Sequence, residues 1–524
     1  MRDLLRLADT VILPGFPGTA PPDWLRGRLA DGLAGVVLFS RNVESPGQLA
    51  DLTAALRAEN PHVLVGIDEE AGDVTRLEAR TGSSRPGNYA LGVVDDEELT
   101  EQVARDVGRD LAAAGVNLDF APAADVNSNP DNPVIGLRAF GADPELVARH
   151  TAAWIRGLQS AGVAACAKHF PGHGDTAVDS HHGVPQVTVS REELAEVELW
   201  PFRAAIREGV RSIMTGHLLV TAYDDGLPAT LSPRILTGLL RKELGFDGLI
   251  VTDGIEMAAV SGPYGLGGAS AMAVAAGADA VCVGGENSDE EALEHIRRAI
   301  VAAVVEGRLP EERLADAARR VRELASWHAA QQAGQTGEAG KAGRSGQAGR
   351  SGGQAAGSPG ANGSGPGTPV GIGLVAARRA IRVTTRAGAA VVLPLAESPH
   401  VVELAPETNL AIDKNMPWGA AEPLGRMLPG TTVTRLRESD VADGVPPAAL
   451  GRAAGRPLVV VVRDAHRHPW QLDTLSHLLS ARPDGVVVEM GLPGRTDLGA
   501  VHIATHGAAR VCGQAAAEVL IGRV

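Results

Sequence analysis

The chain has 524 residues, a formal net charge of −15 and 44% hydrophobic residues. This composition excludes global disorder, and the length exceeds what one compact core usually holds, so we expect two or three domains. The acidic charge argues against a nucleic-acid partner and against an anionic membrane surface, because both need a basic face.

Cysteine use and hydropathy indicate the compartment. Cys166, Cys282 and Cys512 are odd in number and far apart, so we expect reduced thiols in the core rather than disulfides. No stretch reaches the ~18 uncharged apolar residues that a membrane span needs, and charged residues interrupt the N-terminal apolar stretch. We therefore expect a cytoplasmic protein with no membrane partner.

Short apolar runs alternate with helical patterns over residues 1–330. Runs typical of strands buried on both sides are 35–39, 63–67, 116–120, 163–167, 210–214, 249–252 and 280–283. Candidate helices between them are 97–114, 144–161, 191–208 and 233–244. The alternation predicts an α/β fold with a (β/α)8-type TIM-like barrel, and a doubly wound open sheet is the alternative.

Residues 331–368 are rich in Gly, Ala, Ser and Gln and almost lack large apolar side chains, so they predict a flexible linker. Residues 369–524 again alternate strand-like runs, at 391–395, 401–404, 457–462 and 485–490, with helical stretches. They predict a smaller α/β domain with an open sheet. This part has no Gly-rich phosphate fingerprint.

Polar residues follow the carboxyl end of nearly every predicted barrel strand. Asp68, Asp125, Lys168, His217 and Asp253 all stand at such positions. Catalytic groups of β/α barrels collect at this face, so the pattern favours a barrel enzyme over a purely structural set of loops.

The segment 168–185 holds four of the 15 histidines, on a loop that Pro and Gly keep from being helical. One interpretation is a metal site built from His169, His173, Asp175 and His181, since these side chains suit zinc or iron. Another interpretation is that the histidines are simply exposed in a mobile loop.

The remaining interpretation of segment 168–185 is a proton-transfer site made by Asp179 and His181. The two residues are two positions apart, so in extended chain both side chains project the same way. A carboxylate beside an imidazole orients the ring, sets its tautomer and stabilises its cation. The pair is therefore a competent general acid/base.

Asp253 follows an apolar strand and precedes Gly254, so its carboxylate is expected at the barrel mouth. A nucleophilic carboxylate needs such a fixed mounting, because in-line attack tolerates little misplacement. The alternative is an N-cap for a short helix at residues 254–259.

Further charged groups are predicted around the same mouth. Charged side chains there suit hydrogen bonding to a polyhydroxylated ligand, although each alone could form a structural ion pair. These residues are Asp68, Arg138, Lys168, His169 and His217.

Four motifs in this order carry a family resemblance: NPVIGLRAFG, KHFPGHGDTAVDSH, IMTGHL and VTDGIEM. They resemble glycoside hydrolase family 3, and within it the β-N-acetylglucosaminidases of the NagZ type. The likeness covers roughly residues 5–330, and the C-terminal part is similar to the second domain of the family.

The resemblance implies a retaining double displacement, with Asp253 as nucleophile and His181, supported by Asp179, as acid/base. Retention requires the two groups roughly 5–5.5 Å apart, on opposite sides of the bond. Neither a metal nor an organic cofactor is implied. The resemblance assigns sugar binding to Asp68, Arg138, Lys168 and His169, and adds Arg76, His217 and Met257 as further candidates.

The expected activity is exo-cleavage of terminal β-linked N-acetylglucosamine from muropeptide- or chitin-derived oligosaccharides, by a chain that we expect to be monomeric. A β-N-acetylglucosaminide phosphorylase and a β-glucosidase of the same family remain alternatives. From other classes, so do a metal-dependent hydrolase and a non-catalytic sugar-binding protein.

One stretch departs from the family pattern DQEGG-R-V-x-R-L. Here it is DEEAGDVTRL, in which Glu69 and Ala71 replace Gln and Gly, and Asp73 replaces an Arg. We expect this exchange of a cation for an anion to alter the sugar pocket or the packing of the loop. The positions that match are Asp68, Glu70, Gly72 and Arg76.

Overall fold

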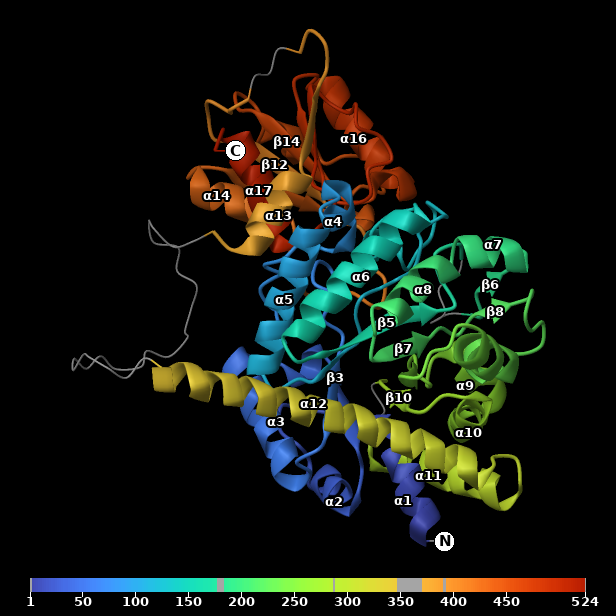
Figure 1. Cartoon of the computed structure of the whole chain (residues 1–524). Coiled ribbons are helices and arrows are strands. Elements are labelled where there is room, and N and C mark those ends of the chain that lie inside the picture. Colours follow the sequence, from blue (N-terminus) through green and yellow to red (C-terminus); the bar gives the residue numbers. More distant parts are fainter. Residues whose placement is uncertain (1, 177–182, 286–287, 346–369, 390–392, 524) are drawn as a thin grey trace.

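A computed structural model describes residues 2–523 except 177–182, 286–287, 346–369 and 390–392. In the first domain, six parallel strands form one hydrogen-bonded sheet in the order β2-β3-β4-β5-β7-β9, and β10 pairs in parallel with β1 (Figure 1). The strands are β1 (Ile12–Pro14), β2 (Gly35–Leu38), β3 (Leu64–Ile67), β4 (Leu118–Asp119), β5 (Ala164–Phe170), β7 (Ser212–Thr215), β9 (Leu249–Thr252) and β10 (Val281–Val283).

The sheet closes into a barrel. A parallel bridge between Val251 and Ala280 joins β9 to the start of β10. On the other side of β1, Gly35 of β2 lets the two strands approach, because a Cβ there would lie 2.5 Å from Cδ2 of Leu13. The predicted barrel is confirmed, and the open-sheet alternative is wrong for this domain.

Successive strand residues point alternately inward and outward, as the pleat requires. Val37 of β2 and Cys166 of β5 belong to the cluster that fills the barrel. Their neighbours Val36 and Ala165 belong to the cluster beneath the surrounding helices. Burial on both faces explains why these strands are continuous apolar runs in the sequence.

Helices surround the barrel and link its strands. The predicted helix 191–208 is divided into α7 and α8, and the predicted helix 233–244 has π-type geometry. A small pair of strands, β6 (Gln186–Val187) and β8 (Leu219–Val220), lies beside the barrel. The helices are α1 (Arg2–Thr10), α2 (Asp23–Asp31), α3 (Pro46–Glu59), α4 (Asn88–Val94), α5 (Glu97–Ala113), α6 (Pro144–Ser160), α7 (Arg191–Glu196), α8 (Leu199–Arg207), η4 (Arg234–Glu243), α9 (Ala258–Tyr264), α10 (Leu266–Ala276) and α11 (Glu290–Val305).

A long helix, α12 (Glu311–Ser345), lies across the amino-terminal end of the barrel (Figure 1). Its residues Val321, Leu324 and Ala325 join the inward-facing strand residues in one apolar cluster, so the helix closes this end of the barrel. The helix continues to Ser345, so the first part of the predicted linker is helical. Residues 346–369 lie outside the described residues, and the predicted domain limits stay a prediction.

The second domain contains a six-stranded sheet in the order β11-β16-β15-β14-β12-β13, in which only β11 is antiparallel to its neighbour. The predicted strand 391–395 is wrong in its described part, because residues 393–395 form no strand. The strands are β11 (Arg382–Thr385), β12 (His400–Leu404), β13 (Thr432–Leu436), β14 (Leu458–Val462), β15 (Val486–Glu489) and β16 (Val501–Ala504). The helices are α13 (Ile372–Ala380), α14 (Ala421–Met427), α15 (Pro447–Gly451), α16 (Pro469–Ala481) and α17 (Arg510–Leu520).

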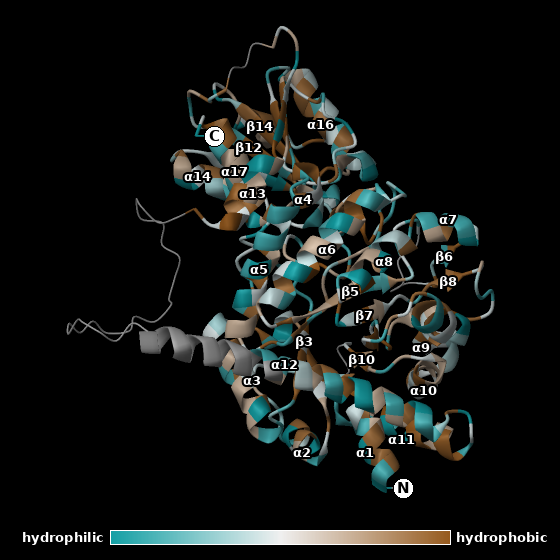
Figure 2. Cartoon of the chain, viewed as in Figure 1, coloured by the Kyte–Doolittle hydropathy of each residue, from teal (hydrophilic) through white to brown (hydrophobic). Residues whose placement is uncertain are grey.

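The two domains are in contact. Helix α13 packs against α4 and α5 of the barrel domain, and Arg379 of α13 forms an ion pair of 2.7 Å with Asp96 at the start of α5. Figure 2 shows hydrophobic residues concentrated in the strands of both domains and hydrophilic residues on the outer helix faces. Each domain therefore has its own core.

Replacing Leu324 with Ala should destabilise the barrel domain by about 2–3 kcal/mol, because it leaves a cavity in the closed end of the barrel. The matched control is Val305→Ala, since Val305 is 64% exposed and its truncation should change the free energy of unfolding by less than ~0.5 kcal/mol. Denaturant unfolding measures both. Equal effects of the two variants would contradict the assigned role of α12.

Candidate active site

The charged residues predicted from strand ends do meet at one face. Asp68 follows β3, Asp125 follows β4, Lys168 and His169 lie in β5, and Asp253 follows β9. These strands are parallel and neighbouring, so their carboxyl ends form a single rim.

A buried lysine is the centre of this rim. The Nζ of Lys168 lies 2.6 Å from Oδ1 of Asp68 and 2.7 Å from Oε1 of Glu70. Burial lowers the pKa of Lys168, but the two carboxylates more than offset this effect, so the pKa is raised above its usual value. The ammonium is therefore charged, and its two partners hold it at the rim.

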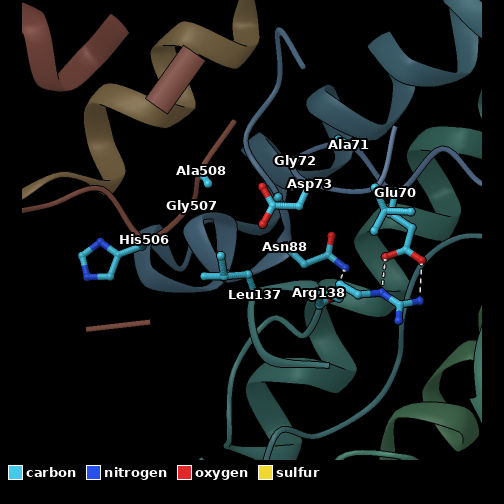
Figure 3. A pocket seen from close by; sticks show the side chains of 12 residues that line it. Glu70, Ala71, Gly72, Asp73, Asn88, Leu137, Arg138, His506, Gly507 and Ala508 are labelled. Carbon is cyan, nitrogen blue, oxygen red and sulfur yellow. Dashed lines mark hydrogen bonds and ion pairs between the residues drawn. The ribbon is translucent and has the colours of Figure 1, made fainter. Parts of the chain in front are cut away.

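Arg138 extends the network through a bidentate pair with Glu70. Its Nε and Nη2 donate to Oε2 and Oε1 of Glu70 over 3.0 and 2.8 Å, and Figure 3 shows these two contacts. The arginine comes from a short 3-10 turn (Gly136–Arg138), which is held because the Asn132 side chain accepts the amides of Val134 and Ile135. Although burial opposes ionisation, Arg138 and Lys168 lower the pKa of Glu70.

His169 is oriented by a carboxylate that the sequence marks only by its place at a strand end. Its Nδ1 lies 2.8 Å from Oδ2 of Asp125, and its Nε2 lies 3.3 Å from Nη2 of Arg138. The other oxygen of Asp125 accepts the backbone amides of His169 and His173 over 3.1 and 2.8 Å. Asp125 therefore anchors the chain where it leaves β5.

Asp253 is fixed by its own turn. Its Oδ1 accepts the amide of Gly254 over 2.7 Å, and its amide donates to the carbonyl of Thr215 over 3.1 Å. The helix α9 begins at Ala258 after the N-cap Met257, so the N-cap interpretation of Asp253 is wrong. The carboxylate is mounted at the rim without serving a helix.

Three further candidates, His217, Met257 and Arg76, contact the turns and loops around the site. His217 is fully buried, and its two nitrogens contact the Gly254 carbonyl (2.9 Å) and the Thr230 hydroxyl (2.8 Å), so it supports the turn at Asp253. The Met257 amide donates to that same carbonyl over 3.0 Å. Arg76 lies 3.7 Å from Asp68 and donates to the Ala411 carbonyl over 3.1 Å.

The predicted acid/base pair lies outside the described residues, since Asp179 and His181 fall within 177–182. His181 also belongs to the predicted four-residue metal set, so one member of that set lies outside the described residues. Among the residues that the structure does describe, no three His, Cys, Asp or Glu side chains converge on a metal position. Of that set, His169 pairs with Asp125, and Nδ1 of His173 contacts the Thr176 hydroxyl.

Two carboxyls near the site, the buried Glu198 and the half-buried Glu256, were not found by sequence reasoning. Glu198 lies against the loop after β5, where a Cβ on Gly172 would be 2.3 Å from its Oε2. Burial first, then the charges of Asp125 and Asp175, raise the pKa of Glu198 well above its usual value. Burial also raises the pKa of Glu256, with a contribution from Asp253. Glu198 falls inside a predicted helix, so only the fold could reveal it.

The three cysteines are buried and free of disulfides, as expected. In the described part of the chain, no helix combines the length and the apolar character needed to cross a bilayer.

We compared the sequence of the chain with known protein families. Residues 26–324 match the profile described as glycosyl hydrolase family 3 N terminal domain, which is more than half of the chain. The chain belongs to glycoside hydrolase family 3. The family resemblance suggested by the motifs is thus confirmed, and the protein is a glycosidase.

Among curated relatives of this family 3 glycosidase, a beta-hexosaminidase of Stenotrophomonas maltophilia is 37% identical over 297 residues, which are 55% of this chain and 87% of that protein. Beta-hexosaminidase A of Pseudoalteromonas piscicida is 36% identical over 264 residues, 46% of this chain and 44% of that one. The chain thus spans less than half of this second relative.

The solved structure of a glycoside hydrolase family 3 beta-N-acetylglucosaminidase from Paenibacillus sp. str. FPU-7 has a TM-score of 0.83 and 33% identity. The match covers 99% of this chain and 97% of that one, so both domains share this layout. A beta-N-acetylhexosaminidase from Beutenbergia cavernae matches 62% of this chain and 98% of its own, with a TM-score of 0.56 and 28% identity.

Glu69, which replaces the usual Gln of the family pattern, is buried behind the rim. Its Oε2 accepts the amides of Arg76 and Leu77, each over 2.9 Å. Burial raises the pKa of this carboxyl to about 7. A protonated Glu is neutral like the Gln it replaces, so the exchange is tolerated below about pH 7.

We expect Glu69 to lower the stability of the protein as the pH rises through this range, and Glu69→Gln to remove this contribution. A raised pKa in the folded state stabilises it fully below the pKa of the unfolded chain, and the contribution disappears as the pH passes about 7. Between pH 5 and 8 the variant should retain about 2 kcal/mol that the wild type loses. Urea unfolding at several pH values measures the difference, with the exposed Glu98→Gln as control. Parallel pH curves for wild type and Glu69→Gln would contradict this assignment.

Proposed function

We propose that the chain is a retaining exo-β-N-acetylglucosaminidase. Asp253 attacks the anomeric carbon of a terminal β-linked N-acetylglucosamine and forms a glycosyl-enzyme. His181, supported by Asp179, protonates the departing oxygen and then activates the water that releases the sugar. The substrate class is muropeptide- or chitin-derived oligosaccharides.

The observation that carries this proposal is the mounting of Asp253 beside a charged cluster. The Gly254 amide orients one carboxylate oxygen, and the buried His217 holds the Gly254 carbonyl, so the nucleophile has little freedom. Lys168 and Arg138 of the same rim offer charge-assisted hydrogen bonds to sugar hydroxyls. Similarity to the Paenibacillus beta-N-acetylglucosaminidase supports the choice of N-acetylglucosamine.

Electrostatics favours water over phosphate as the second acceptor. Each described cation of the rim already faces a carboxylate: Lys168 faces Asp68, Arg138 faces Glu70 and Arg76 faces Asp68. Asp125 and Asp253 add further acidic groups. A phosphate dianion would meet no excess of positive charge, so hydrolysis is preferred to phosphorolysis.

Asp253→Asn should reduce release of p-nitrophenol from p-nitrophenyl N-acetyl-β-glucosaminide by about 10⁴-fold or more, because covalent catalysis is lost. Wild-type enzyme should release N-acetylglucosamine at the same rate with and without phosphate, and a 1-phosphate product would indicate phosphorolysis instead. Asp175→Asn is the matched control, since Asp175 is not part of the proposed dyad. Wild-type turnover by Asp253→Asn would refute the nucleophile assignment.

His181→Ala should lower hydrolysis of the same substrate by about 10²–10⁴-fold, as expected for loss of a general acid/base. Substrates with a dinitrophenyl leaving group need no protonation, so their first step should be retained. Azide needs no general base, so it should restore turnover and give a β-glycosyl azide. The adjacent His182→Ala is the control, and absence of azide rescue in His181→Ala would count against the proposed role.

A further inference from the structure

A buried ion pair crosses from the barrel to the second domain. Nη2 of Arg463, which follows β14, lies 2.7 Å from Oδ2 of Asp73, which belongs to the loop after β3. Each side chain is only 5% exposed. Asp73 is the residue that departs from the family pattern by replacing an Arg, and its partner comes from the second domain.

Arg463 is itself held in place. Its backbone amide donates to Oε1 of Gln471 over 3.1 Å, and its carbonyl accepts from Nε2 of the same side chain over 2.7 Å. The guanidinium lies 5.7 Å from the centre of the Trp418 ring. The second domain therefore presents a fixed cation to the loop.

Asp73 and the sugar-site carboxylate Glu70 belong to one tight turn. Ala71 and Gly72 both have left-handed backbone, with φ values of 60° and 59°. The amide of Glu70 donates to the carbonyl of Val74 over 2.9 Å and closes the turn. Figure 3 shows the two side chains diverging, with Glu70 directed toward Arg138 and Asp73 away from it. A shift of Asp73 must therefore move Glu70.

A second set of contacts runs in the same direction. Val74 packs in an apolar cluster with Ile412 and Met416 of the second domain. Arg76 donates to the carbonyl of Ala411 and lies 3.7 Å from Asp68. The second half of the loop is thus held from the second domain, and Arg76 connects it to Asp68.

The charges of the pair depend on each other. Burial raises the pKa of Asp73, the charge of Arg463 lowers it and the charge of Asp464 raises it. Removal of one partner would leave the other buried and uncompensated, which is costlier than removal of both. The pair should therefore act as one unit.

We propose that Asp73 and Arg463 are positioning residues, through which the second domain holds the loop 68–76 so that Asp68 and Glu70 keep Lys168 and Arg138 aligned for the sugar. Neither residue touches the substrate in this proposal. The inference rests on the proposed function, because it takes the sugar as the ligand of that rim.

The test is a double-mutant cycle in the full-length protein with Asp73→Asn, Arg463→Met and the double variant. Each single variant should raise KM for p-nitrophenyl N-acetyl-β-glucosaminide by about tenfold and change kcat by less than about threefold. The double variant should have a KM no higher than the worse single variant, whereas independent effects would multiply to about a hundredfold. The midpoint of thermal unfolding is recorded for every variant.

The matched control is another domain-crossing pair, Asp96 and Arg379, which joins α13 to the start of α5. Asp96→Asn and Arg379→Met should leave KM within about twofold of wild type, as expected of an exposed pair. The rise in the midpoint of thermal unfolding that N-acetylglucosamine causes is measured in the same variants, because it reports sugar binding without turnover. This rise should become smaller only in the Asp73 and Arg463 single variants and in their double variant.

The outcomes separate the two proposals. If Asp73→Asn and Arg463→Met lower the midpoint of unfolding but leave KM and sugar binding unchanged, the pair only joins the domains and the positioning role is overturned. Multiplicative KM effects would overturn it as well. A wild-type enzyme that cleaves no β-N-acetylglucosaminide refutes the proposed function, whereas the cycle read by sugar binding still decides the positioning role.

Discussion

The site depends on keeping a lysine charged inside the protein. Lys168 is almost fully buried, and an ammonium in such a place is costly unless opposite charges surround it. Asp68 and Glu70 meet this requirement, and Glu70 is in turn held by the bidentate Arg138. The result is a chain of alternating charges in which each group fixes the next. In the proposed function, this preformed array binds sugar hydroxyls without reorganising when the substrate arrives.

The parallel barrel makes this array possible. Residues that are distant in the sequence end on neighbouring strands, so their side chains converge at the carboxyl edge. The loops are then held by hydrogen bonds to backbone groups. Asp125 accepts two amides at the start of the segment that leads to His181, and the Gly254 amide and His217 fix the turn of Asp253. The turn of Asp253 and the chain at His169 and His173 are thus anchored.

The second domain does more than cover the barrel. Arg463 and Ala411 contact the loop that carries Asp68 and Glu70, through Asp73 and Arg76. At position 73 the anion Asp replaces the Arg of the family pattern. The second domain supplies the cation Arg463 as its partner. The substitution at position 73 is therefore matched by a contact between the domains.

Local pattern was enough to predict most of the barrel strands, the strand-end residues and the family. Each buried strand is a short apolar run, and Asp68 and Asp253 directly follow such runs. The sequence failed where the partner is remote. Closure through Leu13 and Gly35, the anchoring role of Asp125, the buried Glu198 and the pairing of Asp73 with Arg463 all involve residues brought together only by folding. Sequence alone determined which chemical groups are present and on which face they stand. The tertiary structure decided which charges compensate each other, because burial and distance, rather than position along the chain, set the energy of a charge.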